Sequence, residues 1–396
     1  MKGPSYPASR IVAPRLQALF TAHVAEARRR GHQQLATVPD ADAIEAMVVA
    51  AFWASLRREE GYSPKISLAF AAPHETIDPL LFERPLPLDA AALTRVAPAV
   101  ERPGIHLGVW WDGDLSPRSA TSGAQSREGD DLSVWGTTHA IPMTCFVLEV
   151  ASPGLLVVKH HRGDESGKFV NVAVLEGDEV KVVDERASSL PGCPALLTSL
   201  LGFDSPASWA DDSLNVLVEL AVSMRGHGRG GLLLVVPAGG DGWRESIARP
   251  IPYAVSPPFT ELAALCREAP ETRRGREWQD AFPRAVDGIA GLTAVDGAAI
   301  LTADYEVLAF GAKIVRRKGS PQIEQVTVTQ PIEGAQASLV DPAQLGGTRH
   351  LSAAQFVHDQ RDAIALVASQ DGRFTVFAWS PFEGMVHAHR VEALLL

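Results

Sequence analysis

The stretch Leu345–His350 contains residue types that could hold a phosphorylated ligand. It reads Leu-Gly-Gly-Thr-Arg-His. Paired glycines let a backbone approach a ligand closely, and arginine presents a planar pair of donors that suits phosphate oxygens. The residues that follow have apolar side chains at helical spacing, namely Ala353, Ala354, Phe356 and Val357. Thr348, Arg349 and His350 are therefore predicted beside a helix N-terminus, where free N–H groups favour an anion. The alternative is a loop arginine and a capping threonine that bind nothing.

A second candidate is Asp296, which precedes Gly297, Ala298 and an apolar run. A carboxylate at the edge of an apolar strand is a poor core residue, and it could hold a divalent ion that bridges phosphates. Taken alone, Asp-Gly is a common turn. The pattern therefore gains meaning only together with Gly347–His350.

Length and composition predict a soluble globular protein of two domains, with three domains as the alternative. The chain has 396 residues, of which 46% are hydrophobic and 21% are charged. No apolar run is long enough to cross a bilayer, and the first residues lack the apolar core of a signal peptide. Three cysteines, widely separated, fit neither a disulfide framework nor a metal knuckle, so a cytoplasmic location is expected. The net charge of −11 argues against a broad nucleic-acid surface but allows a local nucleotide site.

The N-terminal half is predicted to be an α+β domain spanning residues 1–205. Residues 1–10 are expected to be a frayed tail, and two helices are expected from Pro14 and from near Asp40. Short apolar runs separated by turn residues then predict a mainly antiparallel sheet: 65–71, 106–111, 144–150, 155–160, 169–175 and 180–183. Residues 190–207, rich in proline and glycine, are the expected linker.

The C-terminal half, residues 206–396, is predicted to be an α/β domain. A helix near 214–224 precedes a strand at 232–236, and a second helix from Trp278 leads to a hairpin at 298–302 and 307–310. Another hairpin is expected around Asp371-Gly372. The literal GxGxxG at 226–231 lies after a helix and before a strand, the reverse of a dinucleotide-binding turn, so a tight turn is predicted there. His387 and His389 would point the same way on a last strand, but they lack a third metal ligand.

Together these patterns in the C-terminal half resemble the diadenylate cyclase (DAC) domain. The ordered residues that carry the resemblance are Asp296-Gly297-Ala298, Gly347-Thr348-Arg349-His350 and Ala368-Ser369-Gln370, with residues 231–236 similar to the first strand of that domain. The resemblance covers roughly residues 211–396, with an apparent insertion near 256–276. It implies a mixed sheet flanked by helices.

The resemblance also implies a reaction that joins two ATP molecules into cyclic di-AMP and releases pyrophosphate. Two protomers would meet face to face as a homo-oligomer, so that each 3′-hydroxyl attacks the α-phosphorus held by the other. Asp296 would bind Mg²⁺ or Mn²⁺ and help to activate the 3′-oxygen. The resemblance implies further contacts to the nucleotide. The triphosphate would be held by Gly347, Thr348, Arg349 and His350. Ser369 and Gln370 would lie near the nucleotide, and Ile314 would touch adenine.

One position departs from the DAC pattern. The second arginine of that pattern is replaced by Leu351, and the loss of one charged hydrogen bond corresponds to about tenfold to a hundredfold in affinity. Arg316, Arg317 or Lys318 are the cations expected to compensate.

The N-terminal half resembles the uncharacterised sensor-like domain that precedes some cyclase domains. The matching residues are Ala51–Leu56 and Arg58–Gly61. This resemblance implies regulation by an unknown input and names no ligand.

Three functions follow from these patterns. The first is a diadenylate cyclase with an N-terminal regulatory domain. The second is a binding module that senses ATP or a cyclic dinucleotide without making it, which Leu351 favours and Asp296 opposes. The third is an α/β protein unrelated to nucleotides.

Overall fold

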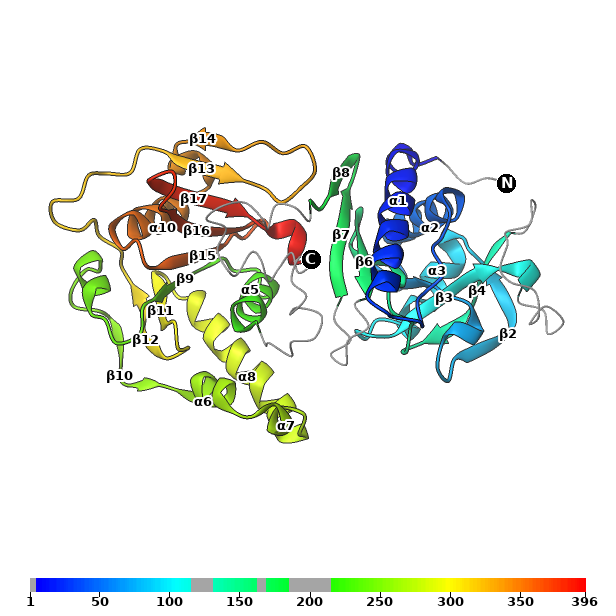
Figure 1. The fold of residues 1–396 in the computed structure, drawn as a ribbon, viewed down its shortest axis with the longest axis horizontal. Coiled ribbons are helices and arrows are strands. Elements are labelled where there is room, and N and C mark those ends of the chain that lie inside the picture. Colours follow the sequence, from blue (N-terminus) through cyan, green and yellow to red (C-terminus); the bar gives the residue numbers. More distant parts are fainter. Residues whose placement is uncertain (1–4, 115–130, 162–168, 185–214) are drawn as a thin grey trace. The chain divides into compact units, whose positions relative to one another are not determined.

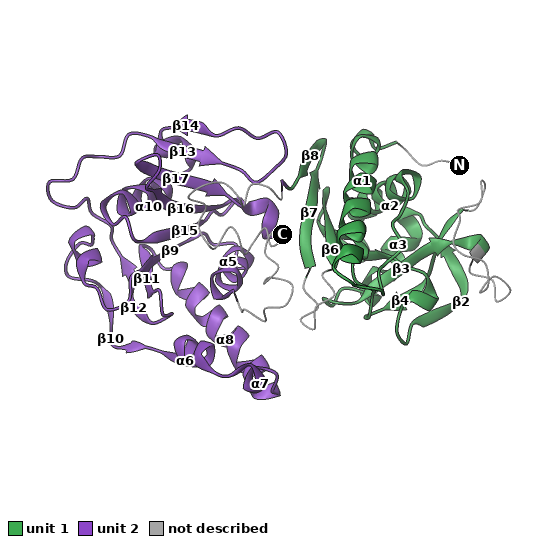
Figure 2. Ribbon diagram, viewed as in Figure 1, with its two compact units in different colours: residues 1–183, 396 green, residues 184–395 purple. Residues whose placement is uncertain are grey.

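The computed structural model describes residues 5–114, 131–161, 169–184 and 215–396. The chain divides into two compact units, Met1–Val183 with Leu396, and Asp184–Leu395 (Figure 2). The predicted domain boundary at 205/206 and the predicted linker at 190–207 lie outside the described residues. No described helix combines the length and apolar character needed to span a membrane.

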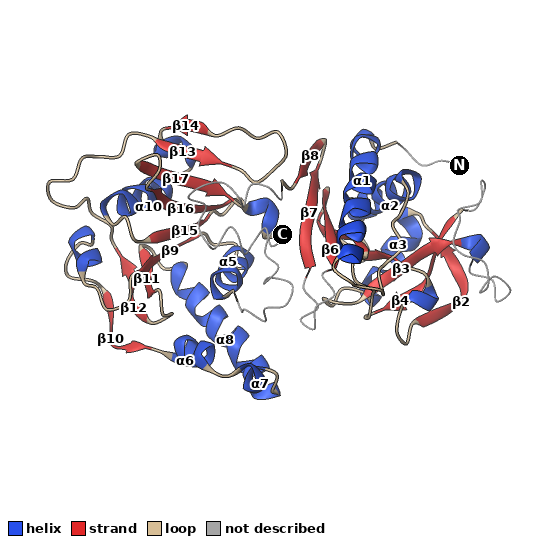
Figure 3. Ribbon diagram, viewed as in Figure 1, coloured by secondary structure: helices blue, strands red, loops and turns tan. Residues whose placement is uncertain are grey.

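Unit 1 is an α+β unit built on an eight-stranded sheet (Figure 3). Its strands, in the order β2-β4-β3-β1-β5-β6-β7-β8, are β1 (Ser67–Phe70), β2 (Leu80–Pro87), β3 (His106–Trp111), β4 (Leu132–Thr138), β5 (Phe146–Ser152), β6 (Leu155–His161), β7 (Phe169–Glu176) and β8 (Glu179–Val182). β1 and β3 pair in parallel, and the other neighbours are antiparallel, so the mainly antiparallel prediction is confirmed.

The described residues of unit 1 form three α-helices: α1 (Pro7–Arg29), α2 (Ala41–Ser55) and α3 (Ala90–Val96). α2 begins where predicted, because the Asp40 carboxylate accepts a hydrogen bond from the Ala43 N–H at 2.8 Å. The prediction of a frayed tail is wrong for residues 5–10, and α1 begins at Pro7 instead of Pro14; residues 1–4 lie outside the described part of the chain. Pro7 suits the first turn of α1, and the ring of the buried Tyr6 stacks on Phe52 with 3.8 Å between centroids.

Unit 2 has a nine-stranded mixed sheet, in the order β10-β12-β11-β9-β15-β16-β17-β13-β14. The strands are β9 (Gly231–Val236), β10 (Tyr253–Phe259), β11 (Ala298–Thr302), β12 (Val307–Ala312), β13 (Val326–Thr329), β14 (Ser338–Val340), β15 (Ile364–Ala368), β16 (Phe374–Ser380) and β17 (Met385–Arg390). β9 pairs in parallel with β11 and β13 pairs in parallel with β17, whereas the remaining pairs are antiparallel.

Helices cover both faces of this sheet (Figure 1). They are α5 (Val216–Gly226), α6 (Glu261–Arg267), α7 (Pro270–Arg273), α8 (Arg276–Thr293), α9 (Pro342–Leu345) and α10 (Thr348–Asp359). Leu233 and Val235 of β9 pack on the core of α5 and α8, and Leu232 and Leu234 pack on the core of α10. A strand covered on both faces has no polar face, which explains why β9 is a continuous apolar run. The predicted mixed sheet with flanking helices is confirmed. The expected insertion at 256–276 comprises the end of β10, α6, α7 and the first residue of α8.

Phe356→Ala should destabilise unit 2 by about 3–5 kcal/mol, because Phe356 is completely buried in the α10 core. The free energy of opening would be measured from hydrogen exchange of the β15 amides. Phe382→Ala is the matched control, since Phe382 is 74% exposed, and it should change this free energy by less than about 0.5 kcal/mol. Equal effects of the two substitutions would contradict the assigned core.

Candidate functional site

The sheet order of unit 2 brings three separate motifs to one edge of the sheet. β11 runs parallel to β9, with Ala299 opposite Leu233, so Asp296 lies near the residues that precede β9. β15 runs antiparallel to β9, with Ala368 opposite Gly231, so Ser369 follows at the same edge. We refer to this edge, at the amino end of β9, as the Asp296 edge.

Helix α10 adds Arg349 to the Asp296 edge. The helix begins at Thr348 after Gly347, as predicted. A Cβ built on Gly230 would lie 2.9 Å from Nη1 of Arg349 and 3.4 Å from Cγ of Gln370. Gly230 also has φ of +72°, a conformation that side chains disfavour. The Arg349 guanidinium thus packs on the backbone of Gly230. This contact was not predicted for the GxGxxG stretch.

Asp296 is exposed and forms an ion pair with Lys313. Its side chain is 89% exposed, and one carboxylate oxygen accepts a hydrogen bond from the Lys313 ammonium. That hydrogen bond, together with the charges of Lys313 and Arg349, lowers the pKa of Asp296 below its ordinary value. Asp296 and Arg349 both lie at the amino end of β9, because β11 runs parallel to β9 and the Arg349 guanidinium lies beside Gly230.

The sequence analysis did not predict that Lys313 lies beside Asp296, although the pairing of the predicted hairpin implies it. β12 pairs with β11 so that Ala312 lies opposite Ala298. The residue after β12 must therefore emerge beside the residues before β11. Gly297 allows the turn before β11 to pack closely on the end of β12. It has φ of +110°, and an added Cβ would lie 2.5 Å from the carbonyl carbon of Gly311.

His350 lies inside unit 2, whereas Gly347 and Thr348 are exposed. His350 is 2% exposed, and its ring is in edge contact with Phe377 at 6.1 Å between centroids. A Cβ on Gly346 would lie 2.4 Å from Nδ1 of His350, so the ring packs directly on the loop before α10. Burial lowers the pKa of His350 below its ordinary value, because a desolvated site disfavours the charged ring.

Ser369 and Gln370 form the turn between β15 and β16. The Ser369 N–H donates to the carbonyl of Arg373 at 2.9 Å. The Gln370 amide donates to the carbonyl of Arg229 at 3.3 Å, which ties this turn to the loop before β9. Ile314 follows Lys313, forms an isolated bridge with Ile247 and packs on the α10 core, so it lies one residue from the Asp296 ion pair.

Leu351 packs on the α10 core and is half-buried. Two of the three cations expected to compensate for the missing arginine lie away from the Asp296 edge. Arg317 and Lys318 line a cleft that also contains Val236, at the opposite end of β9. Lys313 is the cation next to Asp296 instead.

The donor set at the Asp296 edge fits one kind of metal site. Among the residues that the structure describes, no group of three or more histidine, cysteine, aspartate or glutamate side chains could hold a metal ion. Mg²⁺ is often held by one or two carboxylates and completed by substrate phosphates. The exposed carboxylate of Asp296 fits that arrangement.

His387 and His389 on β17 have other partners. Nε2 of His387 is 2.9 Å from Oε2 of Glu383, and Nδ1 of His389 is 2.7 Å from the Thr329 hydroxyl. These contacts are consistent with structural histidines.

In unit 1, the residues that suggested a sensor domain form the end of α2 and the turn after it. A hollow of about 380 Å³ lies there, lined by Arg57, Arg58, Glu59, Ala91, Thr94 and Arg95. Its three arginines give this part of unit 1 a positive rim.

Comparison with known proteins supports the sensor resemblance. The model of the family described as "Probable sensor domain DACNV" matches residues 33–139, which include Ala51–Leu56 and Arg58–Gly61. No curated protein matches the chain. Among solved structures, a double mutant of DacA from Staphylococcus aureus is 17% identical over 44% of this chain and 83% of that chain, with a TM-score of 0.22, which is too low to show a common fold. The predicted resemblance to the sensor-like domain is confirmed for residues 33–139, and the DAC resemblance of unit 2 stays a prediction.

Lys313→Met should raise the pKa of Asp296 toward its ordinary value, because the substitution removes both the hydrogen bond and the main nearby charge. In the parent protein the carboxylate should stay ionised to lower pH than in the variant. Carboxyl ¹³C shifts followed against pH would measure this. Lys318→Met is the matched control and should leave the titration of Asp296 unchanged. An Asp296 pKa that is the same in Lys313→Met as in the parent protein would exclude the ion pair.

Proposed function

We propose that unit 2 is a diadenylate cyclase, which condenses two ATP molecules into cyclic di-AMP and releases pyrophosphate. The observation that carries the proposal is the meeting of Asp296 and Arg349 at the amino end of β9, together with Ser369 and Gln370. These are the residues of the three ordered motifs that resemble the DAC domain. An exposed carboxylate beside a guanidinium and a helix N-terminus can hold a nucleotide triphosphate and its attacking hydroxyl together.

In the proposed reaction the protein aligns the reactants and stabilises charge. The 3′-oxygen of each ATP forms a bond to the α-phosphorus of the other, and the bond from each of these phosphorus atoms to its pyrophosphate oxygen breaks. Two pyrophosphates leave, and the two 3′-hydroxyl protons are released to water. Arg349 and the N–H groups at the start of α10 hold the triphosphate, where they stabilise the negative charge that develops on the leaving pyrophosphate. Asp296 orients the attacking 3′-hydroxyl and favours loss of its proton.

Asp296 would hold a Mg²⁺ or Mn²⁺ ion, and the chemistry supplied there would be neutralisation of phosphate charge. Lys313 bonds to Asp296 in the structure. When Asp296 engages the nucleotide, the Lys313 ammonium becomes available to the phosphates, because it lies on the same edge.

Each Asp296 edge holds one nucleotide, so the reaction requires two protomers whose edges face each other. We further propose that unit 1 regulates this reaction, on the strength of the sensor-family match at residues 33–139.

Asp296→Asn should reduce cyclic di-AMP formation by at least about a hundredfold, because it removes the charge that orients the hydroxyl and the metal. Purified protein would be incubated with ATP and Mn²⁺ or Mg²⁺, and the products resolved by chromatography and mass. Asp304→Asn is the matched control, since Asp304 is an exposed aspartate between the strands of the same hairpin, and it should retain activity. Equal product from the parent protein and Asp296→Asn would remove Asp296 from the mechanism.

A second candidate function is a nucleotide sensor that binds without catalysis. Two observations favour it: Leu351 packs on the core where the DAC pattern has an arginine, and Asp296 already has a cationic partner in Lys313. The sensor would bind ATP or a cyclic dinucleotide at the same edge.

Leu351→Arg distinguishes the two functions. For the cyclase we expect it to strengthen ATP binding about tenfold or more, through one added charged hydrogen bond, and to increase product formation. Calorimetry and product analysis would be run in parallel. Leu351→Gln controls for polarity without charge. Stronger binding with no product from either the parent or the variant would favour the sensor, and unchanged binding would show that residue 351 does not reach the nucleotide.

A further inference from the structure

The ion pair between Lys313 and Asp296 involves the carboxylate that the proposed reaction needs for its metal ion. The Lys313 ammonium donates a hydrogen bond to one carboxylate oxygen of Asp296. A divalent ion held by Asp296 would lie against the same carboxylate, and two cations repel each other strongly at such short range. Lys313 and a metal ion therefore compete for Asp296, and the ammonium is the partner seen in the structure.

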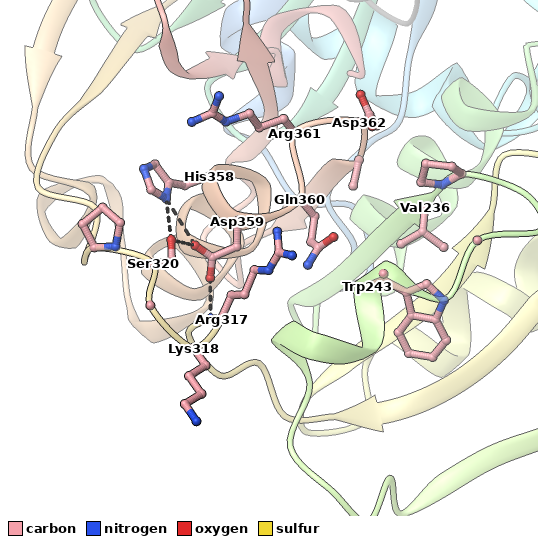
Figure 4. A pocket seen from close by; sticks show the side chains of 16 residues that line it. Val236, Trp243, Arg317, Lys318, Ser320, His358, Asp359, Gln360, Arg361 and Asp362 are labelled. Carbon is pink, nitrogen blue, oxygen red and sulfur yellow. Dashed lines mark hydrogen bonds and ion pairs between the residues drawn. The ribbon is translucent and has the colours of Figure 1, made fainter.

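The backbone of Lys313 is fixed on both sides. β12 pairs with β11 and ends one residue before Lys313. The Lys313 carbonyl accepts a hydrogen bond from the N–H of Ala248 at 2.8 Å. Further along the same segment, at the cleft, the buried carboxylate of Asp359 accepts from the Arg317 N–H at 2.7 Å and holds the segment to the end of α10 (Figure 4). The Lys313 ammonium can therefore change its partner only by rotation of its own side chain.

The side chain of Lys313 is able to make that change. The side chains of Lys313 and Asp296 are 55% and 89% exposed, and an ion pair between exposed groups is weak. Lysine carries three donors on a flexible four-carbon chain, so it can follow a new acceptor without a change in the backbone. The oxygens of a triphosphate carry more negative charge than one carboxylate, so they would draw the ammonium away from Asp296.

The charges at the Asp296 edge favour a nucleotide over a free metal ion. Two cations, Lys313 and Arg349, accompany the single carboxylate of Asp296. Asp371, in the turn between β15 and β16, is paired with Arg373 at 3.3 Å, so these two charges offset each other. A site with a positive balance attracts a triphosphate and repels a divalent cation.

We propose that Lys313 controls the order of binding at the Asp296 edge: it keeps a divalent ion from Asp296 until the phosphates of a nucleotide take up the ammonium. Binding of the nucleotide then has two consequences, since its phosphates gain a cation and the released carboxylate of Asp296 can hold Mg²⁺ or Mn²⁺. This inference rests on the proposed function, because it takes the Asp296 edge as the nucleotide site.

Calorimetry of the full chain tests the proposal through two affinities, one for Mn²⁺ alone and one for ATP without metal. Lys313→Met should strengthen Mn²⁺ binding about tenfold, because it removes the competing charge. The same substitution should weaken binding of metal-free ATP about tenfold, because it removes a charged hydrogen bond to phosphate. A substitution that merely disturbed the fold would weaken both. Lys313→Arg keeps the charge and should resemble the parent protein in both affinities.

Two further variants locate the effect. Adding Asp296→Asn to Lys313→Met should abolish the gained Mn²⁺ binding, because Asp296 is the expected ligand. Lys318→Met is the matched control, since it removes the same charge at the cleft, at the other end of β9 (Figure 4). At an ionic strength of about 0.15 M, screening limits the influence of a distant charge, so Lys318→Met should leave both affinities unchanged.

The proposal is overturned if Lys313→Met binds Mn²⁺ no more tightly than the parent protein, or if the two affinities change in the same direction. It is also overturned if the gained binding persists without the Asp296 carboxylate, or if Lys318→Met has the same effect. Product analysis with ATP and Mn²⁺ separates this inference from the proposed function. Cyclic di-AMP from the parent, with Mn²⁺ affinity unchanged in Lys313→Met, would support the cyclase and reject control by Lys313. Opposite shifts of the two affinities without product would support control by Lys313 at a site that binds without catalysis.

Discussion

Pairing of β9 with two neighbours of opposite direction is the constraint on which unit 2 depends. β11 is parallel to β9, and β15 is antiparallel to it. The start of β11 and the end of β15 must therefore meet at the amino end of β9. This arrangement places the turn with Asp296 and the turn with Ser369 beside Gly230, although the chain separates them widely. A sheet in which β15 ran the other way would move Ser369 and Gln370 to the opposite edge.

Helix α10 connects the two ends of that sheet. Its first turn carries Arg349 to the Asp296 edge, and its last turn carries Asp359 to the cleft at the carboxyl end of β9. Residues 313–317 also run from the Asp296 edge to the cleft. Lys313 forms an ion pair with Asp296, and the backbone N–H of Arg317 donates to Asp359. Basic residues that lie close together in the sequence therefore occupy opposite ends of β9: Lys313 lies at the Asp296 edge, and Arg317 and Lys318 lie at the cleft.

Packing also explains two features at the Asp296 edge. His350 and Leu351 both follow Arg349, but His350 is buried against Phe377 and Leu351 packs on the α10 core. The residues of this turn that remain accessible are Gly347, Thr348 and, in part, Arg349. Phosphate recognition by α10 would therefore rely on one guanidinium and the backbone N–H groups, with Lys313 as the nearby second cation. That arrangement differs from the arginine pair of the DAC pattern.

The sequence by itself determined the local structure: the helix that begins at Thr348, the apolar strand β9 and the two hairpins. These depend on side-chain periodicity and turn residues within a few positions of one another. The mixed sheet with flanking helices was expected from the resemblance to the DAC domain. Only the tertiary structure decided that Lys313 pairs with Asp296, that Gly230 supports Arg349, that residue 351 packs on the core, and that Arg317 and Lys318 line a separate cleft. The prediction of a frayed tail before residue 10 failed because it could not include the stacking of Tyr6 on Phe52 of α2. Contacts between distant residues follow from the order and direction of strands in the sheet, which local periodicity does not specify.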